Sequence, residues 1–234
     1  MLAINDSTGL AHIYGMHEGS GPVHYKRLVN GGMLDGQISG MDYASLPPGS
    51  LIGMHEHPDN AEIWVVLRGQ GHIQHEETER MLDAGQTLYT PAGGRHSMVN
   101  PEVATAPIEF VVVTMMSPTD APAKLPGSEV RTLSGGKATF PGFGDDRYTV
   151  ELRDIAADEA FVVQSDTAQH VVYLVDGAGV LSWGRIESDL ASGAALGIPA
   201  TECVRIKASN ASRLLVVRIE HSGFSTTSAD DART

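Results

Sequence analysis

The sequence predicts an all-β protein whose two halves are copies of one unit. The 26 glycines and 12 prolines interrupt many short apolar runs rich in Val, Ile, Leu and Thr, which is typical of a sandwich or barrel of short strands. No long helical periodicity competes with this pattern. Landmark residues recur in the second half at one fixed spacing, and 234 residues are enough for two domains with a core each.

Four apolar runs are the clearest predicted strands. Each is rich in β-branched or aromatic residues and has Gly, Pro, Asp or Asn close to its ends, where the chain can turn. The four runs cover residues 61–68, 108–115, 171–175 and 213–219. We expect most of the remaining chain to form turns and shorter strands.

A repeat of 108 positions relates the two halves. Three pairs of turn residues share this spacing, namely Gly69 and Gly177, Gly85 and Gly193, and Pro91 and Pro199. The surrounding residues agree, because IWVVLRGQG at 63–71 aligns with VVYLVDGAG at 171–179. Coincident offsets of this kind indicate a duplicated structural unit.

A proline-rich segment separates the two copies. Pro118, Pro122 and Pro126 favour an extended connector, because proline cannot donate to the hydrogen bonds of a sheet. The chain then ends in a polar segment that offers nothing to pack, so we expect a mobile tail. The predicted divisions are a first barrel at 1–117, a linker at 118–129, a second barrel at 130–223 and the tail at 224–234.

The composition excludes several classes of partner. With 16 basic and 29 acidic residues the net charge is -13, which repels nucleic-acid phosphates and anionic membranes. No stretch approaches the roughly 20 consecutive apolar residues of a membrane-spanning helix. Cys203 is the only cysteine, and the first residues lack the features of an export signal. We therefore expect a cytoplasmic protein whose partner is a small molecule.

Four side chains in the first half have the chemistry and spacing of a metal site. His55 and His57 are two residues apart, so on a strand they point to the same face. Turn-forming residues follow and bring Glu62 to the start of the next strand, and a second turn precedes His96. Three neutral imidazoles and one carboxylate suit Mn, Fe, Co, Ni, Cu or Zn rather than Mg or Ca.

These residues lie within two motifs that resemble those of the cupin superfamily, G(x)5HxH(x)3-4E(x)6G and G(x)5PxG(x)2H(x)3N. The sequence matches them with Gly49, His55, His57, Glu62 and Gly69, and with Gly85, Pro91, Gly93, His96 and Asn100. The resemblance implies a bicupin, in which two double-stranded β-helix (jelly-roll) barrels lie in tandem. It also implies one divalent transition metal per chain (Fe, Mn, Ni, Co or Zn), held by His55, His57, Glu62 and His96.

The second half departs from the pattern at the ligand positions. A shift of 108 places Val163, Ser165, His170 and Val204 there, so three of the four ligands are replaced. One histidine does not hold a catalytic metal, because a site needs several converging ligands. We therefore expect a degenerate second barrel that packs against the first or lends loops to its pocket.

Other residues near the motifs are candidates to line a substrate pocket. Trp64 shares the strand parity of Glu62 and should point into the barrel, although core packing explains it equally well. Arg27, like its neighbours Tyr25 and Lys26, could anchor a substrate carboxylate. The full set of candidates is Trp64, Tyr89, Met98, Asn100, Tyr43 and Arg27. We interpret the following histidines as exposed or locally bonded: His12, His17, His24, His72, His75 and His221.

The strand at 61–68 also predicts a covered outer face. Ile63, Val65 and Leu67 are apolar on the side opposite Trp64, and a strand with two apolar faces is normally buried on both. The second barrel, a partner subunit or both would supply the cover. On this ground we predict a homodimer.

The predicted site favours a metal-dependent enzyme acting on a small oxygen-rich or keto-acid metabolite. A metal with open positions can act as a Lewis acid, which gives isomerase or lyase chemistry. Iron can also take substrate and dioxygen side by side, which gives a dioxygenase. The sequence leaves both chemistries open. The alternative is a non-catalytic cupin in which the metal stabilises a barrel that binds a small molecule.

Overall fold

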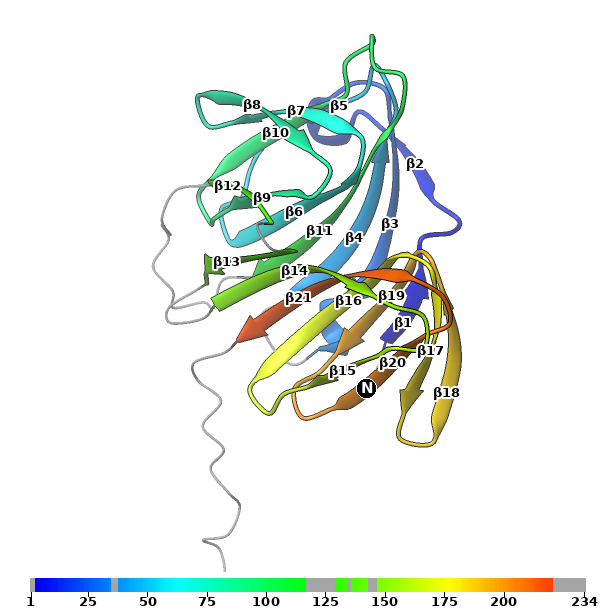
Figure 1. Cartoon of the computed structure of the whole chain (residues 1–234). Coiled ribbons are helices and arrows are strands. Elements are labelled where there is room, and N and C mark those ends of the chain that lie inside the picture. The colour runs from blue at the N-terminus through cyan, green and yellow to red at the C-terminus, as the bar shows by residue number, and fades with distance from the viewer. Residues whose placement is uncertain (1–2, 35–37, 117–128, 134–135, 143–146, 221–234) are drawn as a thin grey trace, which may run out of the picture.

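The computed structural model describes residues 3–34, 38–116, 129–133, 136–142 and 147–220. These residues form four antiparallel sheets, arranged as two barrels that lie side by side (Figure 1). The helical structure in this part of the chain consists of two 3-10 turns, η1 (Met16–Glu18) and η2 (Gly31–Met33). The prediction of an all-β protein with two barrels in tandem is confirmed.

The first barrel combines a seven-stranded and a four-stranded sheet. Its strands are β2 (Ala11–Tyr14), β3 (Pro22–Asn30), β4 (Ile38–Leu46), β5 (Leu51–Glu56), β6 (Asn60–Arg68), β7 (Gln70–His75), β8 (Thr78–Asp83), β9 (Gln86–Thr90), β10 (Arg95–Val99), β11 (Ile108–Met116) and β12 (Glu129–Thr132). The large sheet has the order β12-β9-β6-β11-β4-β3-β2, and the small sheet has the order β5-β10-β7-β8. The predicted strands at 61–68 and 108–115 are β6 and β11.

The second barrel combines a six-stranded and a four-stranded sheet. Its strands are β1 (Ala3–Asp6), β13 (Lys137–Pro141), β14 (Arg147–Ile155), β15 (Ala160–Gln164), β16 (Ala168–Asp176), β17 (Ala178–Trp183), β18 (Ile186–Ala191), β19 (Ala194–Ile198), β20 (Cys203–Ala208) and β21 (Ser212–Glu220). The large sheet has the order β1-β19-β16-β21-β14-β13, and the small sheet has the order β15-β20-β17-β18. The predicted strands at 171–175 and 213–219 lie within β16 and β21.

The repeated glycines mark a backbone conformation that both barrels need at the same place. Gly69 follows β6 and Gly177 follows β16, and both have a positive φ, 79° and 102°. Side-chain atoms would also clash there, because a Cβ on Gly69 would lie 2.6 Å from the carbonyl oxygen of Pro107, and one on Gly177 would lie 2.1 Å from Ser212 Oγ. Glycine alone fits such a turn without strain.

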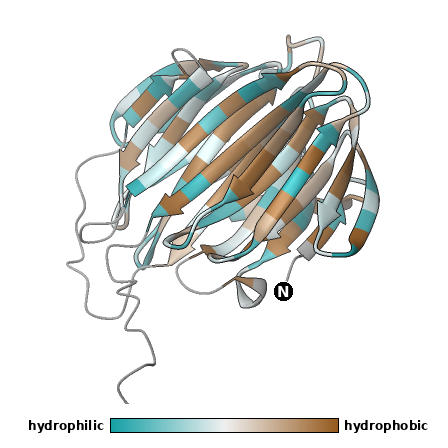
Figure 2. Ribbon diagram, turned by 60° about the horizontal axis from the view of Figure 1, so that its bottom comes forward, coloured by the Kyte–Doolittle hydropathy of each residue, from teal (hydrophilic) through white to brown (hydrophobic). Residues whose placement is uncertain are grey.

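Each barrel has its own apolar interior, and a third core lies between them. Alternate residues of each strand point to opposite faces. In β6, Trp64 and Val66 face the interior of the first barrel, whereas Ile63 and Val65 belong to the core between the barrels. Val171 of β16 and Val217 of β21 reach that core from the other side. Figure 2 shows hydrophobic residues concentrated along the strands in the middle of the molecule.

The core between the barrels accounts for the apolar outer face of β6. Ile63 and Val65 are fully buried within the single chain, and Leu67 packs against the same core. The second barrel therefore supplies the cover that the sequence requires. The homodimer remains a prediction. The apolar outer face of β6 no longer supports it, because that face is buried within one chain.

Two strands cross the predicted domain boundaries. β1, from the start of the chain, pairs with β19 of the second barrel, and β12 pairs with β9 of the first. The proposed divisions at 117 and 130 otherwise stay predictions. Residues 118–128 of the predicted linker and the tail at 224–234 lie outside the described residues. Among the described residues, no helix has the length and hydropathy needed to cross a membrane.

Candidate metal centre

The four predicted ligands come from three neighbouring stretches of the first barrel. His55 lies on β5 directly opposite His96 on β10, so the small sheet brings these two rings together. His57 follows the end of β5, where its backbone N–H donates to Gly94 O at 2.9 Å and its carbonyl accepts from Gly93 N–H at 2.7 Å. Glu62 projects from the large sheet. The turn that contains Gly93 and Gly94 therefore positions one ligand and leads to another.

The ligand atoms of these residues converge on one point. One nitrogen or oxygen atom from each of His55, His57, Glu62 and His96 lies within 4.8 Å of all the others. His96 Nε2 lies 3.2 Å from Nε2 of both His55 and His57. Glu62 Oε2 lies 3.6 Å from Nε2 of His57 and from Nε2 of His96. The spacing of the motif in sequence thus becomes a compact cluster in space.

Neighbouring acceptors fix the orientation of each imidazole. Nδ1 of His55 lies 2.9 Å from the carbonyl oxygen of Gly53, which can only accept, so this nitrogen carries the proton. Nδ1 of His57 lies 2.7 Å from Asn60 Oδ1. Nδ1 of His96 lies 2.6 Å from the Thr90 hydroxyl. With Nδ1 protonated, each neutral ring directs the lone pair of Nε2 into the cluster.

Two donors hold the carboxylate of Glu62. The Trp64 indole N–H donates to Oε2 at 2.7 Å, and the Thr114 hydroxyl donates to Oε1 at 3.1 Å. Thr114 lies directly opposite Glu62 on β11, and Trp64 is two residues along β6, so both partners follow from strand register. Hydrogen bonds of this kind orient a ligating carboxylate.

Burial keeps the imidazoles of His55 and His96 in the neutral form that binds metals. It lowers the pKa of His55 to about 4 and, together with the neighbouring histidines, holds the pKa of His96 well below its usual value. His55 Nε2 and His96 Nε2 therefore face each other as unprotonated lone pairs at 3.2 Å, an arrangement that a cation between them would stabilise. The donor set of three imidazoles and one carboxylate fits a divalent transition metal.

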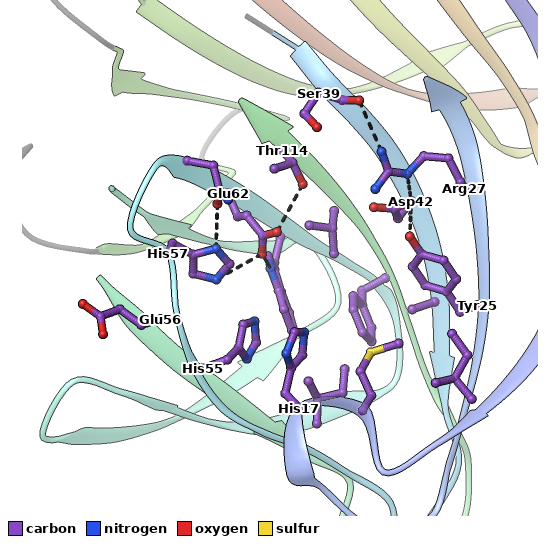
Figure 3. Close-up of a pocket in the computed structure, with 18 of the residues that line it drawn as sticks. His17, Tyr25, Arg27, Ser39, Asp42, His55, Glu56, His57, Glu62 and Thr114 are labelled. Carbon is purple, nitrogen blue, oxygen red and sulfur yellow. Dashed lines mark hydrogen bonds and ion pairs between the residues drawn. The ribbon is translucent and has the colours of Figure 1, made fainter. Parts of the chain in front are cut away.

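The cluster opens onto a pocket of about 600 Å³ in the first barrel. Its apolar wall includes Trp64 and Phe110, whose rings stack with centroids 4.9 Å apart, together with Ile52 and Val112. Figure 3 shows the imidazoles on one side of this pocket and a polar group on the other, whereas the Glu56 carboxylate points away from the imidazoles. The pocket therefore has the four-residue cluster on one side, an apolar middle and a polar far side.

The polar far side is a hydrogen-bonded group on β3 and β4. Asp42 accepts from the Tyr25 hydroxyl at 2.6 Å and from Arg27 Nε. Arg27 Nη1 donates to the carbonyl oxygen of Ser39 at 3.2 Å. Burial raises the pKa of Tyr25 to about 12, so the phenol stays protonated. Arg27 lines the pocket, but the Asp42 carboxylate already neutralises part of its charge.

Of the other pocket candidates, only Trp64 also lines the cavity. Tyr43 and Tyr89 lie in the core between the barrels, where Tyr89 stacks on Phe140 at 5.3 Å. Met98 fills the interior of the first barrel. Asn100 is buried and donates to the carbonyl oxygens of Leu46 and Ala106 at 2.8 and 3.0 Å. None of these four lines the pocket; each supports the barrel.

One of the histidines interpreted as exposed or locally bonded is buried, and another, although exposed, reaches the pocket. His17 lines the pocket and stacks on the ring of His55, with centroids 3.7 Å apart and 6° between the planes. It lies in η1 with a φ of 51°, a strained conformation for a residue with a side chain. His75 is buried beside His96 on β7. His12 and His72 are exposed, and His24 stacks on His12 at 4.2 Å. His221 lies outside the described residues.

Sequence reasoning missed Asp42 and Thr114. Asp42 is an acidic residue in a strand that is otherwise almost wholly buried, and such a residue needs a charged partner. That signal was available in the sequence, but its partner Arg27 is on another strand. Thr114 is one polar residue in a long apolar strand, and only the register of β11 against β6 shows that it faces Glu62.

Comparison with known proteins agrees with this architecture. The family model for the cupin domain matches residues 42–114, which span β4 to β11. An oxalate-binding protein from Thermotoga maritima is 28% identical over 104 residues, which are 44% of this chain and 84% of that protein.

Two solved structures have the same two-barrel fold over nearly the whole chain. The bacterial pirin from Escherichia coli, in complex with nickel(II), has a TM-score of 0.69 at 18% identity and covers 93% of this chain and 98% of its own. Quercetin 2,3-dioxygenase from Acinetobacter baumannii has a TM-score of 0.66 at 12% identity and covers 92% and 85%. The domain match and both motifs therefore identify the first barrel as a cupin domain.

Proposed function

We propose that the protein is a metal-dependent enzyme that acts on a small oxygen-rich or keto-acid metabolite at His55, His57, Glu62 and His96. The observation that carries this proposal is the convergence of these four donors beside a pocket of about 600 Å³. A metal that only stabilised the barrel would need no such access. The alternative is a non-catalytic binding module, in which the same four residues hold a metal and the bound small molecule is not converted to product.

A divalent transition metal held there would supply Lewis-acid polarisation of a substrate oxygen and, in the case of iron, redox chemistry with dioxygen. The surrounding side chains prepare the donors for that role. The Thr90 hydroxyl orients His96, and Trp64 and Thr114 orient Glu62. Because these contacts are made within the barrel, the donor geometry is set by the fold.

The pocket favours a substrate with polar groups at two ends of an apolar or planar body. The stacked rings of Trp64 and Phe110 offer a flat apolar wall, and Arg27 with the Tyr25–Asp42 pair lies across the cavity. The similarity to a protein named for binding oxalate, a dicarboxylate, supports an oxygen-rich ligand. We therefore infer that the oxygen-rich end of the substrate lies beside the four donors while a distal polar group reaches Arg27.

Two chemistries remain in competition, and one observation favours each. The apolar walls built by Ile52, Phe110 and Val112 limit water around the reacting atoms, which suits a dioxygenase. His17 places a fourth imidazole beside the cluster without being one of the four donors, which suits proton transfer in an isomerase or lyase. We favour the dioxygenase, because His17 is largely exposed to solvent.

Elemental analysis of protein purified without oxygen, followed by oxygen-uptake measurements, tests the proposal. We expect one transition metal per chain and, with keto acids and other oxygen-rich metabolites, substrate-dependent oxygen consumption. Turnover without oxygen uptake would support the isomerase or lyase. Saturable binding that yields no product would instead identify a binding module, and two tightly held metals per chain would contradict the assignment of one site.

A variant of His17 separates the two chemistries further. In a dioxygenase that does not use this imidazole for proton transfer, His17→Gln leaves kcat within a few-fold of wild type. In an isomerase or lyase that uses it as base, kcat falls by about 100-fold or more, and the pH profile changes. His12→Gln is the matched control, because His12 is exposed and does not line the pocket.

A further inference from the structure

The second barrel retains a pocket although it has lost the metal ligands. The cavity has a volume of about 250 Å³, comparable with about eight water molecules at roughly 30 Å³ each. Its lining combines apolar residues with cationic and hydrogen-bonding side chains: Lys137, Thr149, Glu151, Phe161, Val162, Val163, Gln164, His170, Val216 and Arg218. These residues lie on β13, β14, β15, β16 and β21, which Figure 1 shows together in the second barrel.

Strand register shows that this pocket occupies the position of the metal pocket in the first barrel. Glu62 lies opposite Thr114 between β6 and β11, and His170 lies opposite Arg218 between β16 and β21. An arginine has therefore taken the place of the threonine that holds the carboxylate ligand.

The other side of this pocket also resembles its counterpart in the first barrel. Arg27 lies opposite Asp42 between β3 and β4, and Lys137 lies opposite Glu151 between β13 and β14. In both pockets, therefore, a cationic residue and an acidic residue lie opposite each other on paired strands. On the metal side, by contrast, Val163 occupies the position of His55 and makes that wall apolar.

Within the described part of the chain, two cationic side chains of this pocket, Arg218 and Lys137, lack hydrogen-bond partners for some of their N–H groups. Arg218 Nη2 donates to Glu220 at 2.8 Å, but Arg218 Nε is buried and has no hydrogen-bond partner. Among the described residues, Lys137 forms no ion pair or hydrogen bond that would hold its ammonium group. Glu151 lies 3.6 Å from Arg153, so its charge is shared with a cation outside the pocket.

His170 adds a neutral hydrogen-bonding group. Burial lowers its pKa to about 4, with Arg218 contributing, so its ring is uncharged at pH 7. A neutral imidazole can donate from one nitrogen and accept at the other. The pocket therefore combines two cations, the carboxylate of Glu151, a neutral imidazole and an apolar wall of Phe161 and Val216.

We propose that this second pocket binds a small organic carboxylate, with its anionic group at Arg218 and Lys137 and its apolar body against Phe161, Val163 and Val216. In the first barrel a metal held by the four donors would attract an oxygen ligand, whereas fixed side-chain cations would do so in the second. The two sites would thus bind ligands of related chemistry by different means. The proposal does not depend on the activity of the first barrel.

Calorimetric titration of the full chain with benzoate, after removal of metal by a chelator, tests this assignment. We expect one benzoate site per chain, with benzamide, the uncharged analogue, binding at least about tenfold more weakly. Arg218→Gln should weaken benzoate binding by about tenfold or more, because it removes a charged hydrogen-bond donor. Arg213→Gln is the matched control, since Arg213 lies on the same strand and pairs with Asp154 on the surface.

Arg27→Gln locates the binding site, because it changes only the pocket of the first barrel. We expect this variant to keep the benzoate affinity of the wild type. Loss of binding in Arg27→Gln with retention in Arg218→Gln would overturn the proposal, as would equal affinities for benzoate and benzamide or no saturable binding. If circular dichroism shows that Arg218→Gln does not fold, Lys137→Met supplies the same charge test, since Lys137 is exposed.

Discussion

Replacing Thr90 by valine should weaken metal binding although Thr90 is not a ligand. Thr90 is fully buried on β9, and its hydroxyl lies 2.6 Å from Nδ1 of His96. Valine has nearly the same shape but cannot form this hydrogen bond, so the ring loses the contact that fixes its orientation. Removing such an outer contact typically costs 10- to 100-fold in metal affinity, or about 1.4 to 2.8 kcal/mol.

A matched variant on the same strand controls for the loss of a buried hydroxyl. Thr87 is also fully buried, but its hydroxyl has no hydrogen-bond partner, so Thr87→Val should leave metal affinity unchanged and the fold at least as stable. Competition titration against a chromophoric chelator measures both affinities with the same metal. Equal affinities of the two variants would refute the inference that Thr90 prepares His96 for coordination.

Three further variants test the site and its surroundings. His96→Ala should abolish stoichiometric metal binding by elemental analysis while circular dichroism remains that of a β-rich fold; full occupancy would show that His96 is not a ligand. Because burial lowers the pKa of His170 from 6.5 to about 4, the unfolded chain binds more protons between these values. Stability should therefore fall as pH falls through this window, by up to about 3 kcal/mol, and urea titrations of His170→Gln should show a smaller pH slope. An unchanged slope would contradict the buried, neutral ring. Gly53→Ala should lower the free energy of unfolding by about 1–3 kcal/mol, since a Cβ would lie 1.9 Å from the carbonyl oxygen of His17. Urea unfolding indistinguishable from wild type would show that this contact relaxes freely.

The convergence of the four side chains could be predicted from the sequence because local geometry determines most of it. His55 and His57 share a face of one strand, and turns place Glu62 and His96 at the starts of the strands that follow. Each step depends on spacing within a few residues. The repeat of 108 positions similarly predicts the second barrel, since the same glycine turns follow β6 and β16.

The far side of the pocket could not be predicted in the same way. Arg27 and Asp42 meet because β3 pairs with β4, and Thr114 reaches Glu62 because β11 pairs with β6. These contacts depend on the register of strands that are distant in sequence, and a shift of one residue would turn each side chain to the opposite face. His17 was missed for a related reason, because a strained turn between β2 and β3 carries it to His55.

The two barrels show how a duplicated fold can keep its packing while one copy changes its chemistry. Val171 and Val217 of the second barrel pack against Ile63 and Val65 of the first, so the second barrel buries a face that would otherwise meet water. This requirement constrains the outward-facing residues of β16 and β21 and leaves their inward-facing neighbours free to vary. His170 and Arg218 are such inward-facing positions, and they differ in charge and size from Glu62 and Thr114. The loss of metal ligands therefore did not require loss of the barrel or of its pocket.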